Sequence, residues 1–302
     1  MSLPSHVRLI DVGPRDGLQN EKQMVPTAVK VALVQRLQAA GLKEIEVTSF
    51  VSPKWVPQMA DNAQVMAGLV RQAGVRYSVL TPNLQGFQAA LASAPDEIVV
   101  FGAASEAFSQ KNINCSMAQS IERFAPVVAA ALAAGIGVRG AMSCTVGSPY
   151  EGEIAPERVS TLAGLMKSIG VQRVDVADTI GVGTPLKVQR ALDAALKHFD
   201  LDHVSGHFHD TYGQALANTL AALQLGVWNF QSSVAGLGGC PYAKGATGNV
   251  ATEDVVYMLH GMGIDTGIDL DQLMDAGQFI SQFLGRDTAS RVAKALLTQR
   301  CA

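Results

Sequence analysis

The chain has 302 residues, of which 48% are hydrophobic and 16% are charged, and its formal net charge is −3. This composition is typical of a well-buried globular protein and excludes a disordered chain. Because no run of Lys or Arg is present, the sequence predicts neither a nucleic-acid partner nor a membrane partner and favours a small-molecule one.

Eight short apolar or β-branched runs recur along the chain, and they alternate with segments of helical spacing. The predicted strands are VRLIDV from Val7, EIEVTSF from Glu44, RYSVL from Arg76, EIVVF from Glu97, VRGAMS from Val138, RVDVAD from Arg173, HVSGHFH from His203 and NFQSSV from Asn229. The clearest predicted helices are Thr27–Ala40, Asp61–Ala73, Met117–Ala134, Pro156–Ile169, Pro185–Phe199 and Tyr212–Leu225.

Eight βα units with no Pro/Ser-rich linker predict an α/β fold, a single-domain (β/α)8 TIM barrel. We expect the barrel to occupy about residues 6–252. The tail, about 253–302, carries more helical pattern than the eighth unit needs, so we expect additional C-terminal helices on or beside the barrel mouth. A doubly wound sheet is the alternative, but no GxGxxG motif follows the first strand.

Cysteine usage and the N-terminus both favour a cytoplasmic protein. The four cysteines are widely spaced and form no CxxC pair, in a chain long enough to fold without disulfides. The start, MSLPSHVRLIDVG, shows no signal or transit pattern. The longest weakly polar run, APVVAAALAAGIGV, is shorter than the roughly 20 residues that a membrane-spanning helix needs.

Chemically capable side chains gather where the predicted strands end. In a TIM barrel the carboxyl ends of the strands meet at one mouth, which holds the active site. The sequence therefore predicts an enzyme with its site at this mouth. The residues are Arg15 and Asp16 after the first strand, Glu46 closing the second, Asp178 after the sixth, His207 and His209 ending the seventh, and a glycine-rich loop after the eighth.

The motif GHFHD places His207 and His209 two residues apart, so both rings face the same side of a strand. They could be two hydrogen-bonded histidines in a polar barrel mouth. Nearby oxygen ligands, Asp16 and Asn249, favour a metal site instead. This mixed nitrogen and oxygen set without a thiolate suits Mg²⁺ or Mn²⁺ better than structural Zn²⁺.

Arg15 and Asp178 each have a structural and a catalytic interpretation. Arg15 could orient the Asp16 carboxylate, or it could stabilise an enolate or thioester oxygen with its forked donors while Glu46 holds it in place. Asp178, in ADTIGVGTP, could cap the turn that follows it or could transfer a proton.

The loop SVAGLGGCPYAKGATGN places Cys240 among five glycines. A thiol in this setting has few side chains to pack against, although a small buried residue is the usual role of a free cysteine. Glycines let a backbone approach a ligand closely. We therefore expect a flap that brings Cys240, as a proton donor, to a substrate.

These motifs together resemble the 3-hydroxy-3-methylglutaryl-CoA lyases, from about Val7 to beyond Tyr257. The resemblance is carried by DVGPRDGLQNE, EVTSFVSPKWVPQMAD, ADTIGVGTP, HFHDTYGQALAN and GLGGCPYAKGATGNVATED. The family belongs to metallolyase barrels that share an Asp/Arg/Glu signature. The related isopropylmalate, homocitrate and citramalate synthases typically read TLRDG where this chain has GPRDG, and they lack the cysteine loop.

The resemblance implies a cytoplasmic bacterial lyase that cleaves 3-hydroxy-3-methylglutaryl-CoA into acetoacetate and acetyl-CoA with Mg²⁺ or Mn²⁺. It also implies a homodimer. The implied metal ligands are Asp16, His207, His209 and Asn249. The implied catalytic residues are Arg15, Asp178, His207 and Cys240, supported by Glu46 and Glu253.

Other functions stay open at this stage. One is a lyase for a longer C3 branch, such as the isohexenyl compound. The others are a Claisen synthase joining an α-keto acid to acetyl-CoA, a pyruvate-forming aldolase, and a non-catalytic binding protein. We expect Lys22 and Lys111 to contact the phosphates of CoA.

Overall fold

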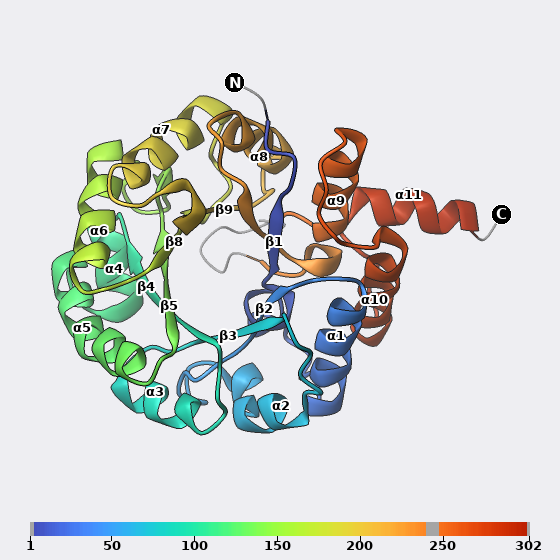
Figure 1. The fold of residues 1–302 in the computed structure, drawn as a ribbon, viewed down its shortest axis with the longest axis horizontal. Helices are drawn as coiled ribbons and strands as arrows, with labels where there is room; N and C mark the ends of the chain where they lie inside the picture. The colour runs from blue at the N-terminus through green and yellow to red at the C-terminus, as the bar shows by residue number, and fades with distance from the viewer. Residues whose placement is uncertain (1–2, 240–247, 301–302) are drawn as a thin grey trace.

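The computed structural model describes residues 3–239 and 248–300 of the chain. Within these residues, eight parallel strands close into a barrel in the order β1, β10, β9, β8, β5, β4, β3, β2. The barrel strands are β1 (Arg8–Asp11), β2 (Glu44–Ser49), β3 (Arg76–Leu80), β4 (Glu97–Ala103), β5 (Gly137–Ser143), β8 (Arg173–Asp178), β9 (Val204–Phe208) and β10 (Asn229–Ser232). The predicted barrel and all eight predicted strands are confirmed (Figure 1).

Helices form the outer ring (Figure 1). Those up to β10 are α1 (Thr27–Ala39), α2 (Asn62–Gly68), α3 (Leu84–Leu91), α4 (Glu106–Ile113), α5 (Met117–Ala133), α6 (Pro156–Ser168), α7 (Pro185–Leu196) and α8 (Ala215–Gln224). Capping residues and prolines determine where several of these helices begin. Ser116 and Gln119 form a capping box at α5, and proline occupies the first position of α6 and of α7.

Three predicted helices are at least three residues longer in the sequence pattern than in the structure. α7 ends at Leu196 rather than at residue 199. α2 ends at Gly68 rather than at residue 73, because Leu69 adopts an extended backbone. α8 begins at Ala215 rather than at residue 212, because Gly213 has a φ of +69° and Asp210 caps the helix through the N–H of Ala215. A hairpin of two short strands, β6 (Gly147–Ser148) and β7 (Gly152–Glu153), also precedes α6 and was not predicted.

The predicted additional helices are present after β10 as α9 (Thr252–Gly261), α10 (Leu270–Phe283) and α11 (Arg291–Arg300). α9 and α10 lie in the outer ring between α8 and α1, and α11 extends away from the barrel beside them (Figure 1). Within the described residues, none of the helices combines the length and the apolar character needed to span a bilayer.

The strand pattern separates two environments. One set of alternate residues packs against the helices as an apolar core, for example Val138 and Met142 of β5. The other set faces the barrel interior, and there β5 and β8 place Arg139 and Asp175, which are 0% and 1% exposed. The interior of this barrel is therefore charged, whereas bulky branched residues usually fill it.

Candidate metal centre and active site

The segment after β1 forms a single π-helical turn, η1 (Gly13–Gly17), which carries Arg15 and Asp16 at the carboxyl end of the strand. Oδ1 of Asp11 fixes its start by accepting the N–H of the first glycine at 2.8 Å. The last glycine is required by a close approach, because a Cβ there would lie 2.7 Å from Cβ of Leu237. Packing of this turn thus sets where the two charged residues stand.

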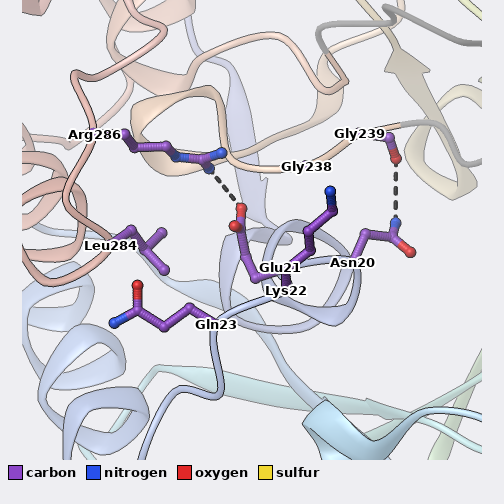
Figure 2. A pocket seen from close by; sticks show the side chains of 8 residues that line it. All are labelled: Asn20, Glu21, Lys22, Gln23, Gly238, Gly239, Leu284 and Arg286. Carbon is purple, nitrogen blue, oxygen red and sulfur yellow. Dashed lines mark hydrogen bonds and ion pairs between the residues drawn. The ribbon is translucent and has the colours of Figure 1, made fainter.

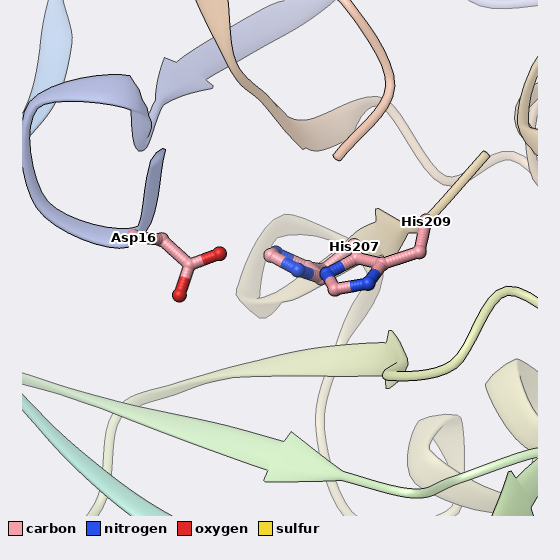
Figure 3. Close-up of side chains that lie close together, drawn as sticks. All are labelled: Asp16, His207 and His209. Atoms are coloured by element: carbon pink, nitrogen blue, oxygen red, sulfur yellow. The ribbon is translucent and has the colours of Figure 1, made fainter. Parts of the chain in front are cut away.

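β9 brings two histidines to the same mouth. Phe208 packs in the apolar core, so its neighbours His207 and His209 face the barrel interior. Their ring centroids are 5.2 Å apart. Figure 3 shows the Asp16 carboxylate facing both rings, and one ligand atom from each of the three residues lies within 4.8 Å of the other two. The structure therefore brings together three of the four predicted ligands as a possible metal-binding group.

The protonation states of His209 and Asp16 fit a divalent cation. Burial and the neighbouring His207 lower the pKa of His209 to about 4, although Asp16 opposes this. Burial alone would raise the pKa of Asp16, but Arg15, both histidines and a hydrogen bond from Asn249 lower it to about 2. His209 Nδ1 is also buried without a hydrogen-bond partner in the described parts of the chain. Neutral imidazole and ionised carboxylate are the forms that bind metals.

Asn249, the fourth predicted ligand, reaches the group from beyond β10. It pairs with His209 in an antiparallel bridge. Its Nδ2 donates to Oδ2 of Asp16 at 2.9 Å and to the carbonyl of Leu237 at 3.3 Å. With Nδ2 engaged in this way, the other end of the amide is an oxygen donor of the kind that Mg²⁺ and Mn²⁺ accept.

Arg15 forms ion pairs with Asp16 and Glu46, the two carboxylates that we expected beside it. Nε donates to Oε1 of Glu46, and Nη1 donates to Oδ1 of Asp16 at 2.6 Å. Burial opposes the charge, but the two carboxylates outweigh it and raise the pKa of Arg15 above its usual value. Nη2 makes no hydrogen bond to the rest of the described chain. Nε and Nη1 are therefore fixed by protein carboxylates, while Nη2 keeps its N–H donors available.

Glu46 does not close β2, contrary to the sequence prediction. It lies in the middle of the strand, opposite Ser78 of β3, because β2 continues to Ser49. The side chain is 1% exposed and lies inside the barrel. Its second oxygen, Oε2, accepts from Nη2 of Arg139 at 2.7 Å. Glu46 thus supports Arg15 from within the barrel rather than from the rim.

Asp178 ends β8 as predicted, and its carboxylate caps the following turn. Oδ1 accepts the N–H of Val182 at 3.1 Å and Oδ2 accepts that of Gly183 at 2.7 Å. Burial raises its pKa to about 6, against the lowering effect of these N–H groups and of His207. The capping interpretation is therefore observed, and proton transfer stays a prediction.

The remaining predicted residues occupy separate places. Lys22 lines a cavity of about 380 Å³ beside the start of the glycine loop, in which Arg286 pairs with Glu21 at 2.6 Å (Figure 2). Lys111 lies on α4, with its ammonium 3.8 Å from the ring centroid of Tyr150. Cys240 lies outside the described residues.

Glu253, in the first turn of α9, supports the base of the glycine loop. Its carboxylate accepts the N–H of Ala235 at 2.9 and 3.0 Å. Burial raises its pKa to about 8, and the nearby Asp11 and Asp254 add to the increase.

Comparisons with known proteins agree with this geometry. A family model described as HMGL-like matches residues 6–280. The hydroxymethylglutaryl-CoA lyase of Bos taurus mitochondria is 56% identical over 97% of this chain and 90% of its own length. A Pseudomonas aeruginosa protein named 3-hydroxy-3-isohexenylglutaryl-CoA/hydroxy-methylglutaryl-CoA lyase is 56% identical, over 99% of this chain and all of its own. The chain belongs to the HMGL-like family.

The fold of the chain is also similar to solved structures of HMG-CoA lyases. The crystal structure of hydroxymethylglutaryl-CoA lyase from Pseudomonas aeruginosa has a TM-score of 0.97 at 56% identity, covering 99% of this chain and 100% of that one. An Acinetobacter baumannii HMG-CoA lyase in complex with coenzyme A and 3-methylmalate has a TM-score of 0.93 at 36% identity, covering 98% and 96%.

Two polar residues of this HMGL-like site were not predicted. Gln231 on β10 places Oε1 2.6 Å from Nδ1 of His207, which leaves Nε2 of that ring for a metal. Arg139 on β5 contacts Glu46, as described above. For Arg139 the available signal was a charged residue within the largely apolar run VRGAMS, whereas Gln231 lies among other polar residues in NFQSSV and gave no such signal.

Proposed function

We propose that this chain is a divalent-metal-dependent carbon–carbon lyase that cleaves 3-hydroxy-3-methylglutaryl-CoA into acetoacetate and acetyl-CoA. The observation that carries the proposal is the convergence of Asp16, His207 and His209 beside a half-anchored Arg15, in a chain 56% identical to named lyases over nearly its whole length.

The reaction breaks the bond between C2 and C3 of the acyl group. The C3 hydroxyl loses its proton and becomes the ketone of acetoacetate, while the electron pair of the broken bond passes to the acetyl-CoA enolate. Asp16, His207, His209 and Asn249 would hold Mg²⁺ or Mn²⁺. Such an ion acidifies a hydroxyl that it chelates and stabilises the charge that follows.

Arg15 faces the developing enolate in this proposal. Its Nε and Nη1 are held by Glu46 and Asp16, so the remaining donor on Nη2 is aimed by the protein before substrate arrives. A donor that is pre-positioned in this way stabilises a thioester oxygen more as it gains charge, which lowers the barrier rather than only tightening binding.

Two groups compete for the hydroxyl proton. Asp178 has a raised pKa of about 6, which is suitable for a base near neutral pH, but both of its oxygens already accept backbone N–H groups. His207 itself belongs to the metal-binding group and its Nδ1 is engaged by Gln231, so it can accept the proton only through the nitrogen that the metal would occupy. In this proposal Cys240 returns a proton to the enolate carbon, with His207 assisting.

The CoA moiety lies across the barrel mouth in this proposal. Lys22 supports this placement, because it lines the cavity next to η1 and has no ion-pair partner in the described ranges, whereas Arg286 pairs with Glu21. The complex of the Acinetobacter baumannii relative with coenzyme A is consistent with an acyl-CoA substrate. We also propose a cytoplasmic location and a homodimer.

A coupled assay for acetoacetate and acetyl-CoA tests the function. We expect both products in equal amounts from 3-hydroxy-3-methylglutaryl-CoA with Mg²⁺ or Mn²⁺, and neither after chelation. No product in the presence of metal and reductant would contradict the proposal.

The name of the Pseudomonas aeruginosa relative supports a second substrate, the 3-isohexenyl analogue. Parallel reactions with the methyl and isohexenyl thioesters, compared by kcat/KM, measure this preference. Release of free CoA from acetyl-CoA and glyoxylate, pyruvate or ketoisovalerate would instead indicate a synthase.

A further inference from the structure

A fully buried guanidinium lies within the barrel, one contact away from Arg15. Arg139 of β5 is 0% exposed. Its Nε donates to Glu97 at 2.9 Å and its Nη1 to Asp175 at 2.6 Å. Nη2 donates to Glu46 at 2.7 Å and to Ser78 at 3.3 Å. These four hydrogen bonds reach four different strands, so any displacement of the group would break several of them at once.

Glu46 joins this fixed group to the active site. Its Oε2 accepts from Arg139, and its Oε1 accepts from Nε of Arg15. Each oxygen of this carboxylate therefore accepts from a different guanidinium group. The orientation of this carboxylate decides the direction in which the Arg15 fork points, because a charge-assisted hydrogen bond to Nε fixes the plane of the guanidinium.

We propose that Arg139 is a positioning residue for the reaction, which fixes Glu46 so that Arg15 presents its free donor to the substrate. The inference rests on the proposed function, since it concerns the same enolate. Arg139 itself makes no contact with substrate in this account.

The competing explanation is that Arg139 only stabilises the fold. A second buried arginine of the same interior distinguishes the two roles. Arg139 forms ion pairs with three buried carboxylates, so its loss would also cost stability. Arg173 provides the matched control. It is 6% exposed, lies in the same barrel interior, and binds Glu44 at 2.9 Å and Glu97 at 3.3 Å. Arg173 is thus a buried cation of the same network without a hydrogen bond to Glu46.

The test compares Arg139→Lys with Arg173→Lys in the full chain. Lysine keeps the charge but lacks the planar fork that contacts several carboxylates at once. We measure kcat, KM, Mn²⁺ affinity and the thermal midpoint of each variant. For Arg139→Lys we expect a 10- to 100-fold lower kcat with KM and Mn²⁺ affinity within twofold of wild type. For Arg173→Lys we expect a similar fall in the midpoint and a kcat within twofold.

Equal losses of kcat in the two variants, or a kcat of Arg139→Lys within twofold of wild type, would overturn the proposal. If Arg139→Lys does not fold, the variant Asp175→Asn tests the proposal instead. This change loosens Arg139 without touching Glu46, and we expect kcat to fall at least threefold at constant KM. An unchanged kcat would overturn the inference.

A spectroscopic readout separates this inference from the proposed function. The Nε–H signal of Arg15 in ¹H–¹⁵N spectra, assigned by its loss in Arg15→Lys, reports the hydrogen bond to Glu46 without any substrate. We expect it to shift or broaden in Arg139→Lys and to stay in place in Arg173→Lys. If wild type cleaves no thioester, the function fails, while this signal still decides whether Arg139 positions Arg15.

Discussion

Arg15 uses two of its three guanidinium nitrogens to hold protein carboxylates, and this division gives a direct prediction. Arg15→Lys keeps the positive charge but loses the fork, so the donor that we propose faces the enolate is lost. We expect kcat to fall by about 10² to 10³, the usual effect of removing one preorganised donor, with a small change in KM. Steady-state kinetics at saturating Mn²⁺ measures both.

The control for this variant is the Mn²⁺ affinity, which should stay within a fewfold of wild type. A variant that keeps its full kcat would remove Arg15 from the chemistry.

Asp16 is the charged member of the metal group, and Asp16→Asn preserves its shape while removing the charge. A divalent cation prefers an ionised carboxylate to a neutral amide, so we expect Mn²⁺ affinity to fall at least about 10-fold. Isothermal titration of the chelated protein measures this. The matched control is Asp61→Asn, whose carboxylate pairs with Lys30 at 2.6 Å outside the metal group. Equal affinity in Asp16→Asn and wild type would contradict the assigned ligand.

The sequence predicted some of these residues better than others. His207 and His209 could be paired from spacing alone, because strand alternation puts both rings on one side. Glu46 was placed at the wrong level of the barrel, at the end of a strand that the run EIEVTSF itself carries beyond it, because the level of a side chain depends on its pairing with β3. Arg139 was not predicted because its contacts are made with four partners on other strands, and a single run of sequence contains no information about them.

The turn η1 gives a prediction at the scale of an element. In Gly17→Ala the new methyl group would lie 2.7 Å from Cβ of Leu237 and 2.9 Å from Oγ of Ser233. The turn must shift to relieve this overlap, at a cost of about 1 to 3 kcal/mol, and Asp16 shifts with it. We expect a lower thermal midpoint together with a lower kcat and weaker Mn²⁺ binding.

Gly261→Ala is the matched control for this change, because no atom lies within 4 Å of a Cβ built at Gly261. It should leave all three measurements near wild type. A loss of stability in Gly17→Ala with full kcat and full Mn²⁺ affinity would separate the turn from the site.

Burial of Glu253 gives the element α9 a pH dependence. The pKa of this carboxyl is about 8 in the folded chain, against 4.5 for the ordinary group, so the folded state binds more protons between these values. Stability therefore falls as pH rises through this window, by up to about 1.4 kcal/mol per pH unit from one such group. Glu253→Gln stays neutral and removes this contribution.

Thermal unfolding of both proteins at pH 5, 6, 7 and 8 checks the prediction. The midpoint of Glu253→Gln relative to wild type should rise steadily with pH. A difference that does not change with pH would show that Glu253 is not the group responsible.

Elements were predictable where periodicity was strong. All eight barrel strands appear in the sequence as short apolar runs, and α1 and α5 were predicted to within one residue. The end of α2 and the start of α8 were missed, since helical spacing continues there while glycine and turn chemistry break the backbone. The hairpin β6–β7 has only two residues in each strand, too few for an alternating pattern.

The closed barrel joins residues that the chain separates widely. Asp16 and Asn249 are 233 positions apart and share a hydrogen bond, because β1 and β10 are neighbours where the barrel closes. The charged interior then connects the mouth to deeper layers through Arg15, Glu46 and Arg139. The fold class could be read from the sequence, whereas this connected network required the three-dimensional arrangement.

The central claim is that one divalent ion, held by Asp16, His207 and His209, supports cleavage of the thioester. The measurement that tests it most directly is a titration of the chelated wild-type chain with Mn²⁺, while acetyl-CoA formation and bound Mn²⁺ are followed together. We predict that the rate rises in proportion to bound Mn²⁺ and saturates at one ion per chain, and that Asp16→Asn shifts both curves to higher Mn²⁺ concentration. Full turnover without bound metal, or unchanged curves in Asp16→Asn, would contradict the account.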